Sequence, residues 1–344
     1  MAALLPTTAQ PNPPYPYFPK RIVLAAASRP IGAVCTFADP DTGANRVCTG
    51  SDDHRAFVWD PLDTSDGGER AEPLHVLEHH CGWIRAMATF ADATTGAPRL
   101  ATGAYDCMIN VWDPVHGGDP LRTINGCGHY VTGLSTFTDG VMGPPMLIAA
   151  LADKTIRTWD ATVGEFPALT LKGHADFVYG VACYADSANG GAPRVATGSH
   201  DKTIKVFDPV RGGAALQTMA GHTAGVNCVA AFYDQATGAP RIASGAYDSA
   251  VAIWDPATGA VVHLLQGHPS AIVASLAVFP DPETGAPRLV SGASNRTIRV
   301  WDPSAGGASI QDLVMHMSVK ALAATPKGDA VIAGVGSGGI YMKV

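Results

Sequence analysis

Charged residues are scarce in this chain, and no stretch of it concentrates positive charge. Lys, Arg, Asp and Glu make up only 15% of the 344 residues, and the formal net charge is −7 at pH 7. Lys and Arg never form a long run. Because a protein that binds a nucleic-acid backbone needs a concentrated basic face, the composition argues against nucleic acid as the principal partner.

Long apolar runs and targeting signals are missing as well. No segment reaches the about 18 apolar residues of a membrane-spanning helix, and Met1–Leu5 is too short and uncharged for a secretory signal. The seven cysteines are odd in number and lack Cys-x-x-Cys spacing, which favours reduced thiols over disulfides or a metal centre. We therefore expect a chain without a membrane partner, in the cytoplasm, with the nucleus as a possible additional compartment.

The sequence does contain a dipeptide, Trp-Asp or Phe-Asp, that returns at nearly constant intervals. Its successive aromatic residues are 53, 47, 48, 47 and 47 residues apart. The six aromatics are Trp59, Trp112, Trp159, Phe207, Trp254 and Trp301. A period this regular indicates one supersecondary unit that has been repeated and stacked, so residues 20–344 are expected to form a single domain.

Each copy reads as four short antiparallel strands. In the copy that contains Trp254, strands are expected at 226–232, 241–245, 250–254 and 260–265, with turn residues between them. A sheet this small cannot bury both faces alone, so copies must pack face to face, and a closed ring hides the interfaces. The repeat therefore predicts an all-β ring of small sheets.

Three separated features recur together in most copies: Gly-His near the start, Asp in the turn between the second and third strands, and Trp-Asp after the third strand. Together they resemble the WD-repeat β-propeller family over residues 20–344. The resemblance implies a seven-bladed propeller in which His, Ser or Thr, Asp and Trp form a hydrogen-bonded chain that locks each blade. That chain is complete in blades two and five, with His80, Thr102, Asp106 and Trp112, and with His222, Ser244, Asp248 and Trp254.

The other copies depart from this pattern. The fourth has Phe207 in place of Trp, and the sixth has Asn295 in place of Asp. The third has Cys127 at the His position and Ala149 at the hydroxyl position, and the first has Ala27 where His is expected. We therefore expect blades two and five to be the most rigid.

The last copy lacks a fourth strand, because strands are expected only at 319–324, 330–334 and 339–343. The apolar segment 20–26, just before the first copy, can supply it. Pairing of the two ends would close the ring and leave no open sheet edge, as the resemblance also implies. Residues 1–19 contain six prolines and are expected to form a disordered tail.

A second repeated phrase, Thr-Gly-Ala-Pro-Arg or a close variant, lies in the first hairpin of five copies. Its arginines are Arg46, Arg99, Arg194, Arg241 and Arg288. They could form a ring of cations for an acidic partner, or they could be solvated side chains beside nearby Asp residues in ordinary turns. We favour the second interpretation, because the phrase is rich in turn-forming residues.

Large side chains gather in one set of loops. The resemblance implies that propellers bind partners mostly where the loops before the first strand lie beside those between the second and third. In these loops six large groups fall in blades two to five: Trp83, Tyr105, Tyr130, Phe177, His200 and Tyr247. Exposed aromatics are typical interface anchors, since they bury a large area at little entropic cost. The alternative is that some of them pack between blades.

We interpret the chain as a scaffold or adaptor, a monomeric propeller within a complex, that binds peptides or domains of other proteins over blades two to five. A structural subunit of an assembly is the alternative, and an enzyme or small-ligand receptor is less favoured, because four histidines are assigned to locks. No catalytic residue, cofactor or metal is predicted. Adjacent residues such as His79 and His80 point in opposite directions along a strand, which disfavours a metal site there.

Overall fold

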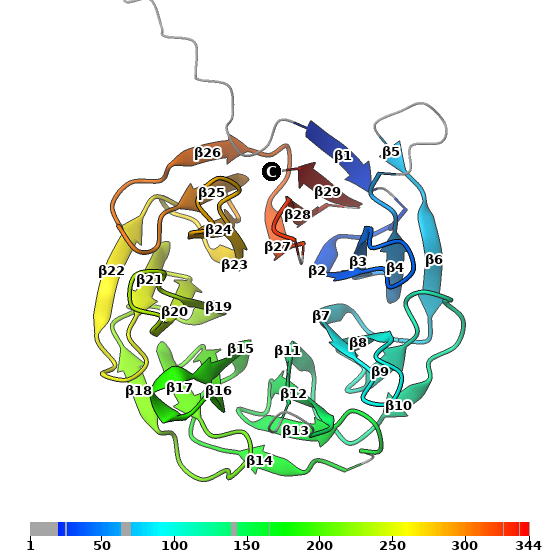
Figure 1. Cartoon of the computed structure of the whole chain (residues 1–344), viewed down its shortest axis with the longest axis horizontal. Coiled ribbons are helices and arrows are strands. Elements are labelled where there is room, and N and C mark those ends of the chain that lie inside the picture. Colours follow the sequence, from blue (N-terminus) through cyan, green and yellow to red (C-terminus); the bar gives the residue numbers. More distant parts are fainter. Residues whose placement is uncertain are drawn as a thin grey trace, which may run out of the picture.

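The computed structural model describes residues 20–24, 26–62, 70–138, 143–164, 166–325, 327–336 and 338–343. Seven antiparallel sheets stand around a central axis as the blades of a closed ring (Figure 1). Within these ranges the one helical element is a 3-10 turn, Ser187–Asn189, and no helix is long and apolar enough to cross a membrane. The predicted all-β, seven-bladed architecture is confirmed, whereas the proline-rich segment 1–19 lies outside the described residues.

Blades one to six each contain four strands, ordered from the axis outward. The strands of blades one to three are β2 (Ile31–Ala38), β3 (Asn45–Ser51), β4 (Arg55–Trp59) and β6 (Pro73–Glu78); β7 (Ile84–Ala91), β8 (Pro98–Ala104), β9 (Ile109–Trp112) and β10 (Arg122–Ile124); and β11 (Val131–Thr138), β12 (Pro145–Leu151), β13 (Ile156–Asp160) and β14 (Leu169–Leu171). Those of blades four to six are β15 (Val178–Asp186), β16 (Ala192–Ser199), β17 (Thr203–Phe207) and β18 (Gln217–Ala220); β19 (Val226–Tyr233), β20 (Pro240–Ala246), β21 (Ala250–Trp254) and β22 (Val261–Gln266); and β23 (Val273–Pro280), β24 (Pro287–Ala293), β25 (Thr297–Trp301) and β26 (Gln311–Val314).

Both ends of the chain build the seventh blade. Its inner strands are β27 (Val319–Ala324), β28 (Ala330–Val335) and β29 (Gly338–Lys343). Strand β1 (Lys20–Leu24) pairs antiparallel with β29 along its whole length. The predicted closure of the ring by the N-terminal strand is confirmed.

A short extra strand, β5 (Arg70–Ala71), extends the sheet of blade seven. It pairs in parallel with Val23 and Leu24 of β1. Strand β5 lies in the connection between β4 and β6, where the first repeat interval is 53 rather than 47 residues. The longer interval therefore supplies a segment that covers part of the edge of the closing strand.

Apolar side chains fill the interfaces between neighbouring blades. Trp112 of blade two packs with Val58 of blade one, and Trp254 of blade five packs with Ile204 of blade four. Trp59 belongs to a cluster with Leu24 of the closing strand. The aromatic of the repeated dipeptide is at most 1% exposed in every copy. Close packing of these large rings makes the ring of blades a rigid support for its loops.

The innermost strand of every blade carries the same irregularity. Its pairing with the second strand slips after the first residue, which leaves one residue unpaired, as in a β-bulge. These residues, one from each blade, are Gly32, Arg85, Thr132, Tyr179, Asn227, Ala274 and Lys320, and all of them line the central channel. The bulge thus decides which side chains surround the channel mouth.

Four of the five arginines of the repeated hairpins lie between two carboxylates of their own blade. Arg46 contacts Asp39 of its hairpin at 2.9 Å and Asp60 of the Trp-Asp dipeptide at 2.6 Å. The other four make similar or longer contacts, and all five side chains are only 8 to 18% exposed. The arginines do lie beside Asp residues, as expected. The expectation that they are solvated was wrong, because four of the five guanidiniums contact two carboxylates of their own blade, and Arg241 contacts Asp255 at 3.8 Å. We call this side of the ring the lower face.

Candidate functional site

The polar lock of blade two contains all four expected side chains. His80 Nδ1 lies 2.7 Å from a carboxylate oxygen of Asp106, and His80 Nε2 lies 2.8 Å from Thr102 Oγ1. Trp112 Nε1 donates to the same hydroxyl at 2.8 Å. The hydroxyl therefore accepts from Trp112 and donates to His80, whose own proton is assigned to Nδ1. Burial opposes ionisation of Asp106, but His80 and the bonds from the backbone N–H groups of Cys81 and Met108 together outweigh it and lower the pKa of Asp106.

Blade five repeats this geometry with a serine. His222 lies 2.9 Å from Asp248 and 2.7 Å from Ser244 Oγ, and Trp254 Nε1 donates to Ser244 at 2.7 Å. The backbone N–H of Thr223 also donates to Asp248 at 2.8 Å. Every buried polar atom of the lock therefore has a partner, and the loop before β19 is fixed to the turn after β20.

Blade six retains a lock by adding one member. His268 Nε2 lies 2.6 Å from Ser291 Oγ, which also accepts from Trp301 at 2.8 Å. His268 Nδ1 lies 2.8 Å from Thr297 Oγ1, and Thr297 donates to Asn295 at 2.6 Å. Thr297 thus connects His268 to the residue that replaces Asp. Burial, together with the charge of Arg299, lowers the pKa of His268 to about 4.

The remaining locks are shorter. In blade four, His174 bonds Asp201 and Thr197, but Phe207 has no donor. In blade one, Trp59 donates to Thr49 at 3.0 Å without a histidine.

Blade three departs furthest from the pattern. Cys127 and Ala149 are fully buried, and the buried Nε1 of Trp159 has no hydrogen-bond partner. Burial raises the pKa of the Cys127 thiol to about 12, so this position stays uncharged at neutral pH.

The locks hold two sets of loops against each other on the side of the ring that we call the upper face. In blade two the N–H of Tyr105, beside the lock Asp, donates to the carbonyl of Trp83, just before β7. The same bond joins Tyr247 to Gly225 in blade five. The predicted rim residues of blades two, four and five therefore project from loops that are fixed by both backbone bonds and locks, whereas the loop of Tyr130 in blade three has the backbone bond from Ala152 without a lock.

Three of the predicted aromatics form one stacked group over blades two and three. The rings of Trp83 and Tyr105 are 5.6 Å apart, and those of Tyr105 and Tyr130 are 4.7 Å apart and nearly parallel. The guanidinium of Arg85 lies 5.2 Å from the Trp83 ring and bonds Asp52 at 2.9 Å. Stacking and the ion pair fix this group in one arrangement.

A second group covers blades four and five. His200 packs edge-on against Tyr247 at 5.8 Å and against Tyr179 at 6.3 Å, and its Nδ1 lies 3.1 Å from Asp176. Phe177 is 41% exposed and makes no ring contact among the described residues. The six predicted residues therefore lie on one face as two groups and one separate ring.

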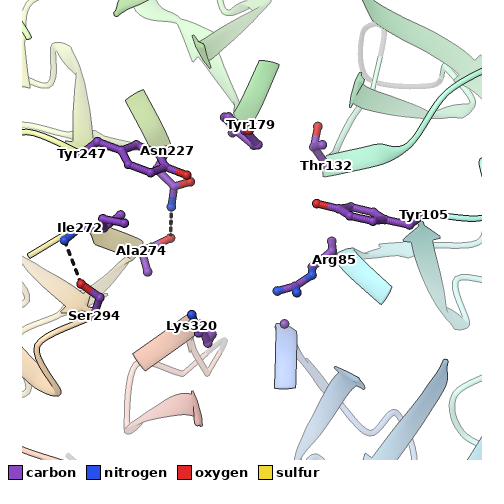
Figure 2. Close-up of a pocket in the computed structure, with 11 residues that line it drawn as sticks. Arg85, Tyr105, Thr132, Tyr179, Asn227, Tyr247, Ile272, Ala274, Ser294 and Lys320 are labelled. Atoms are coloured by element: carbon purple, nitrogen blue, oxygen red, sulfur yellow. Dashed lines mark hydrogen bonds between the residues drawn. The ribbon is translucent and has the colours of Figure 1, made fainter. Parts of the chain in front are cut away.

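A cavity of about 330 Å³ opens between these groups, at the mouth of the central channel (Figure 2). All seven blades contribute to it: the lining residues are Gly32, Arg85, Tyr105, Thr132, Tyr179, Asn227, Tyr247, Ile272, Ala274, Ser294 and Lys320. Tyr105 and Tyr247 lie on opposite sides of the opening, as Figure 2 shows. Of the six predicted residues only these two line the cavity, while the others surround it.

The described residues contain no group of three or more His, Cys, Asp or Glu that could hold a metal ion. The histidines of blades two, four, five and six lie in the locks instead. What the upper face offers is therefore aromatic area, a polar opening and positive charge.

Comparison with known proteins identifies the repeat. The family model described as WD domain, G-beta repeat, matches residues 71–113, 166–208, 213–255 and 259–302, which together make up half of the chain. The chain belongs to the WD40 repeat family. The four matched segments contain the histidines of the locks in blades two, four, five and six, whereas blades one and three of this WD40 propeller lack that histidine.

A solved structure shows the same fold. The crystal structure of the WD40 beta propeller domain of Doa1 matches with a TM-score of 0.73 at 22% sequence identity, over 95% of this chain and 97% of that chain. No curated protein matches the chain significantly.

Several residues of the WD40 propeller's channel mouth were missed from the sequence. The most important are Arg85, Tyr179 and Lys320, each the bulged residue of its innermost strand. The repeat register could have located them, because they all stand one residue after the first residue of that strand. Whether that residue faces the channel or a neighbouring blade depends on the bulge, which the sequence pattern does not show.

Proposed function

We propose that this WD40 propeller is a protein-interaction scaffold that binds a peptide or a domain of a partner on its upper face, over blades two to five. WD40 propellers generally act as scaffolds of this kind. The observation that carries the proposal is the exposure of large aromatic rings on fixed loops. Trp83, Tyr130, Phe177 and Tyr247 are 46%, 44%, 41% and 38% exposed.

Rigid aromatic rings of this kind are effective anchors. They bury a large apolar area on binding. Because their loops are already fixed, little conformational entropy is lost when a partner binds. The aromatic residues of the repeated dipeptides, in contrast, are fully buried between blades. Four of the exposed aromatics thus gather on the upper face, whereas the exposed Phe166 and Tyr233 lie outside its loops.

A structural role in an assembly is a second candidate, because apolar side chains are exposed on the outer wall. On β22, Val261, Val262 and Leu264 are all at least 40% exposed. An exposed edge strand with apolar side chains can pair with or pack against another subunit. The outer wall and the upper face can be tested separately.

The test is affinity capture from a native lysate, read by mass spectrometry, with the wild-type chain, Trp83→Ala/Tyr247→Ala and Val262→Ser/Leu264→Ser. We expect the upper-face double variant to lose its captured partners, because central interface anchors each contribute about 2 kcal/mol or more. Its melting temperature should change little, since both rings are exposed. Loss of partners from the outer-wall variant alone would instead favour the assembly role and contradict the proposal.

A further inference from the structure

We infer that the partner segment, if it binds on the upper face as proposed above, places an acidic side chain in the mouth of the channel, where Lys320 and the tyrosine hydroxyls hold its carboxylate. The inference names the chemistry of the partner and therefore rests on the proposed function. It comes from the charge of the upper face and from the polar groups that line the opening.

Each acidic residue in the upper-face loops already has a partner. Seven carboxylates pair with Arg or His of the same face: Asp52 with Arg85, Asp53 with Arg55, Asp106 with His80, Asp153 with Arg157, Asp176 with His200, Asp201 with His174, and Asp248 with His222. Five exposed cations in the same loops and at the channel mouth have no carboxylate within ion-pair distance among the described residues: Arg29, Lys154, Lys202, Arg296 and Lys320. A neutral histidine bonds a carboxylate without cancelling its charge, so the aspartates of the four histidine pairs remain negative and the five exposed cations offset them. The upper face is therefore close to electrically balanced, although the whole chain carries −7.

The lower face shows the opposite balance. In four of its five hairpins one arginine contacts two carboxylates, as Arg288 contacts Asp281 and Asp302. Each of these groups carries a net negative charge. The excess of carboxylates therefore lies on the face away from the stacked aromatic rings, and an acidic segment is favoured on the upper face relative to the lower one.

Two cationic residues line the mouth of the channel, and they differ in whether another side chain of the protein already binds them. Arg85 is held by Asp52 and by the Trp83 ring, and the absence of a side chain at Gly32 makes room for it, since a Cβ there would lie 3.0 Å from Arg85 Cδ. Its charge is therefore balanced and its position fixed. Lys320 is exposed at the same opening without such a partner, so it is the cation that is available to a ligand.

Hydrogen-bond donors without protein partners complete the site. The hydroxyls of Tyr105, Tyr179 and Tyr247 make no hydrogen bond to the described residues, and Figure 2 shows those of Tyr105 and Tyr247 directed toward the opening. By contrast, Asn227 Nδ2 already donates to the carbonyl of Ala274 at 2.9 Å. A carboxylate accepts up to about four hydrogen bonds, so the ammonium of Lys320 and the phenolic hydroxyls match its needs.

A single-stranded nucleic acid fits this surface less well. Nucleobases bind by stacking on open aromatic faces. Here Tyr105 is stacked between Trp83 and Tyr130, and Arg85 covers part of the Trp83 ring. Tyr105 is thus stacked on both sides and offers a ligand at the opening only its edge and its hydroxyl. These groups suit a peptide side chain.

The experiment measures binding of the full chain to three pools of fluorescent eight-residue peptides that differ only in a fixed central Glu, Gln or Lys. We expect the wild type to bind the Glu pool about five- to tenfold more tightly than the Gln pool, as one charge-assisted hydrogen bond predicts. Lys320→Gln should remove this difference, and Lys320→Glu should shift the preference to the Lys pool. Lys202→Gln, which removes an exposed cation elsewhere on the same face, should leave the preference unchanged.

The outcomes separate the inference from the proposed function. If all three pools bind equally and Trp83→Ala/Tyr247→Ala still loses its captured partners, the inference of an acidic side chain is overturned and the scaffold proposal stands. Binding of a ten-nucleotide oligouridine but of no peptide pool would show that the surface takes nucleic acid and would overturn the inference. If no pool binds and the lysate yields no partner, both fail. Melting temperatures of the Lys320 variants check that each is folded.

Discussion

Blades three and five have the same four-stranded sheet and the same buried tryptophan, but the indole N–H of that tryptophan has a hydrogen-bond partner only in blade five. In blade five Trp254 Nε1 bonds Ser244 at 2.7 Å within a complete lock. In blade three the equivalent nitrogen of Trp159 is buried without a partner beside Ala149. Blade three nevertheless forms all four strands. The comparison teaches that apolar packing between blades suffices to build a blade, while the lock adds stability and fixes the loops.

The largest expected effect comes from deleting the lock hydroxyl with an isosteric substitution. Thr102→Val in blade two leaves both Trp112 Nε1 and His80 Nε2 without partners, so we expect it to lower the free energy of unfolding by about 2–4 kcal/mol. Thr49→Val in blade one leaves only Trp59 Nε1 without a partner and should lower the free energy of unfolding by about half as much. Urea unfolding of both variants measures the two values. Equal losses would contradict the view that the lock acts as a connected chain.

An intermediate effect is expected from pH, in blade six. Burial holds the pKa of His268 near about 4, below its ordinary value of 6.5. The unfolded chain therefore binds more protons, and stability is present above about pH 6.5 and is lost as the pH falls toward about 4. Asn295→Asp places a carboxylate near the imidazole of His268 and so favours the charged form of the imidazole. The free energy of unfolding near pH 5 should therefore rise by about 1–2 kcal/mol relative to the wild type.

Unfolding midpoints in urea at pH 7 and pH 5 test this prediction. Asp201→Asn in blade four is the matched reverse variant, because it removes the carboxylate that His174 contacts at 2.8 Å. It should steepen the loss of stability on acidification. Parallel pH profiles for wild type and both variants would rule out a role of the lock histidines in this loss.

The smallest expected effect is a gain in blade three. Ala149→Ser supplies a hydroxyl opposite Trp159 Nε1 and should raise the free energy of unfolding by about 0.5–1.5 kcal/mol. The same substitution in a Trp159→Phe background removes the donor and should bring no gain, so the double-mutant cycle isolates the new bond. A similar gain in both backgrounds would assign the effect to packing instead.

Much of this architecture followed from the sequence, because its repeat register is so regular. The spacing of the Trp-Asp dipeptides predicted six copies of the repeated unit, and the three strand-like segments after residue 319, with the apolar segment before the first copy, predicted a seventh blade and its closing strand. The residues of the complete locks could be assigned one by one. The relay through Thr297 in blade six was missed. The repeat pattern specifies an acidic residue at position 295 and no hydroxyl two residues later.

The candidate site was predicted in part. The loop positions of Trp83 and Tyr247 follow from the repeat register, but their grouping around one opening depends on how neighbouring blades are placed. Sequence spacing relates residues within a blade, whereas the contact of Tyr105 with Tyr130 joins two blades. Contacts between blades are set by the packing of the ring and cannot be read from one repeat.

The sequence by itself determined the kind of fold, the order of strands in a blade and the hydrogen-bonding residues of the complete locks, because these depend on local periodicity and on spacing within one repeat. Only the tertiary structure decided which residues face the channel, where β5 pairs, and that the lower-face arginines are largely shielded from solvent beside carboxylates of their own blade. The tertiary structure also decided that the cations without a carboxylate partner lie on the upper face and the excess carboxylates on the lower face. The physical reason is that a closed ring brings residues about 47 positions apart into contact, and bulges and interfaces then select the side chains that remain exposed.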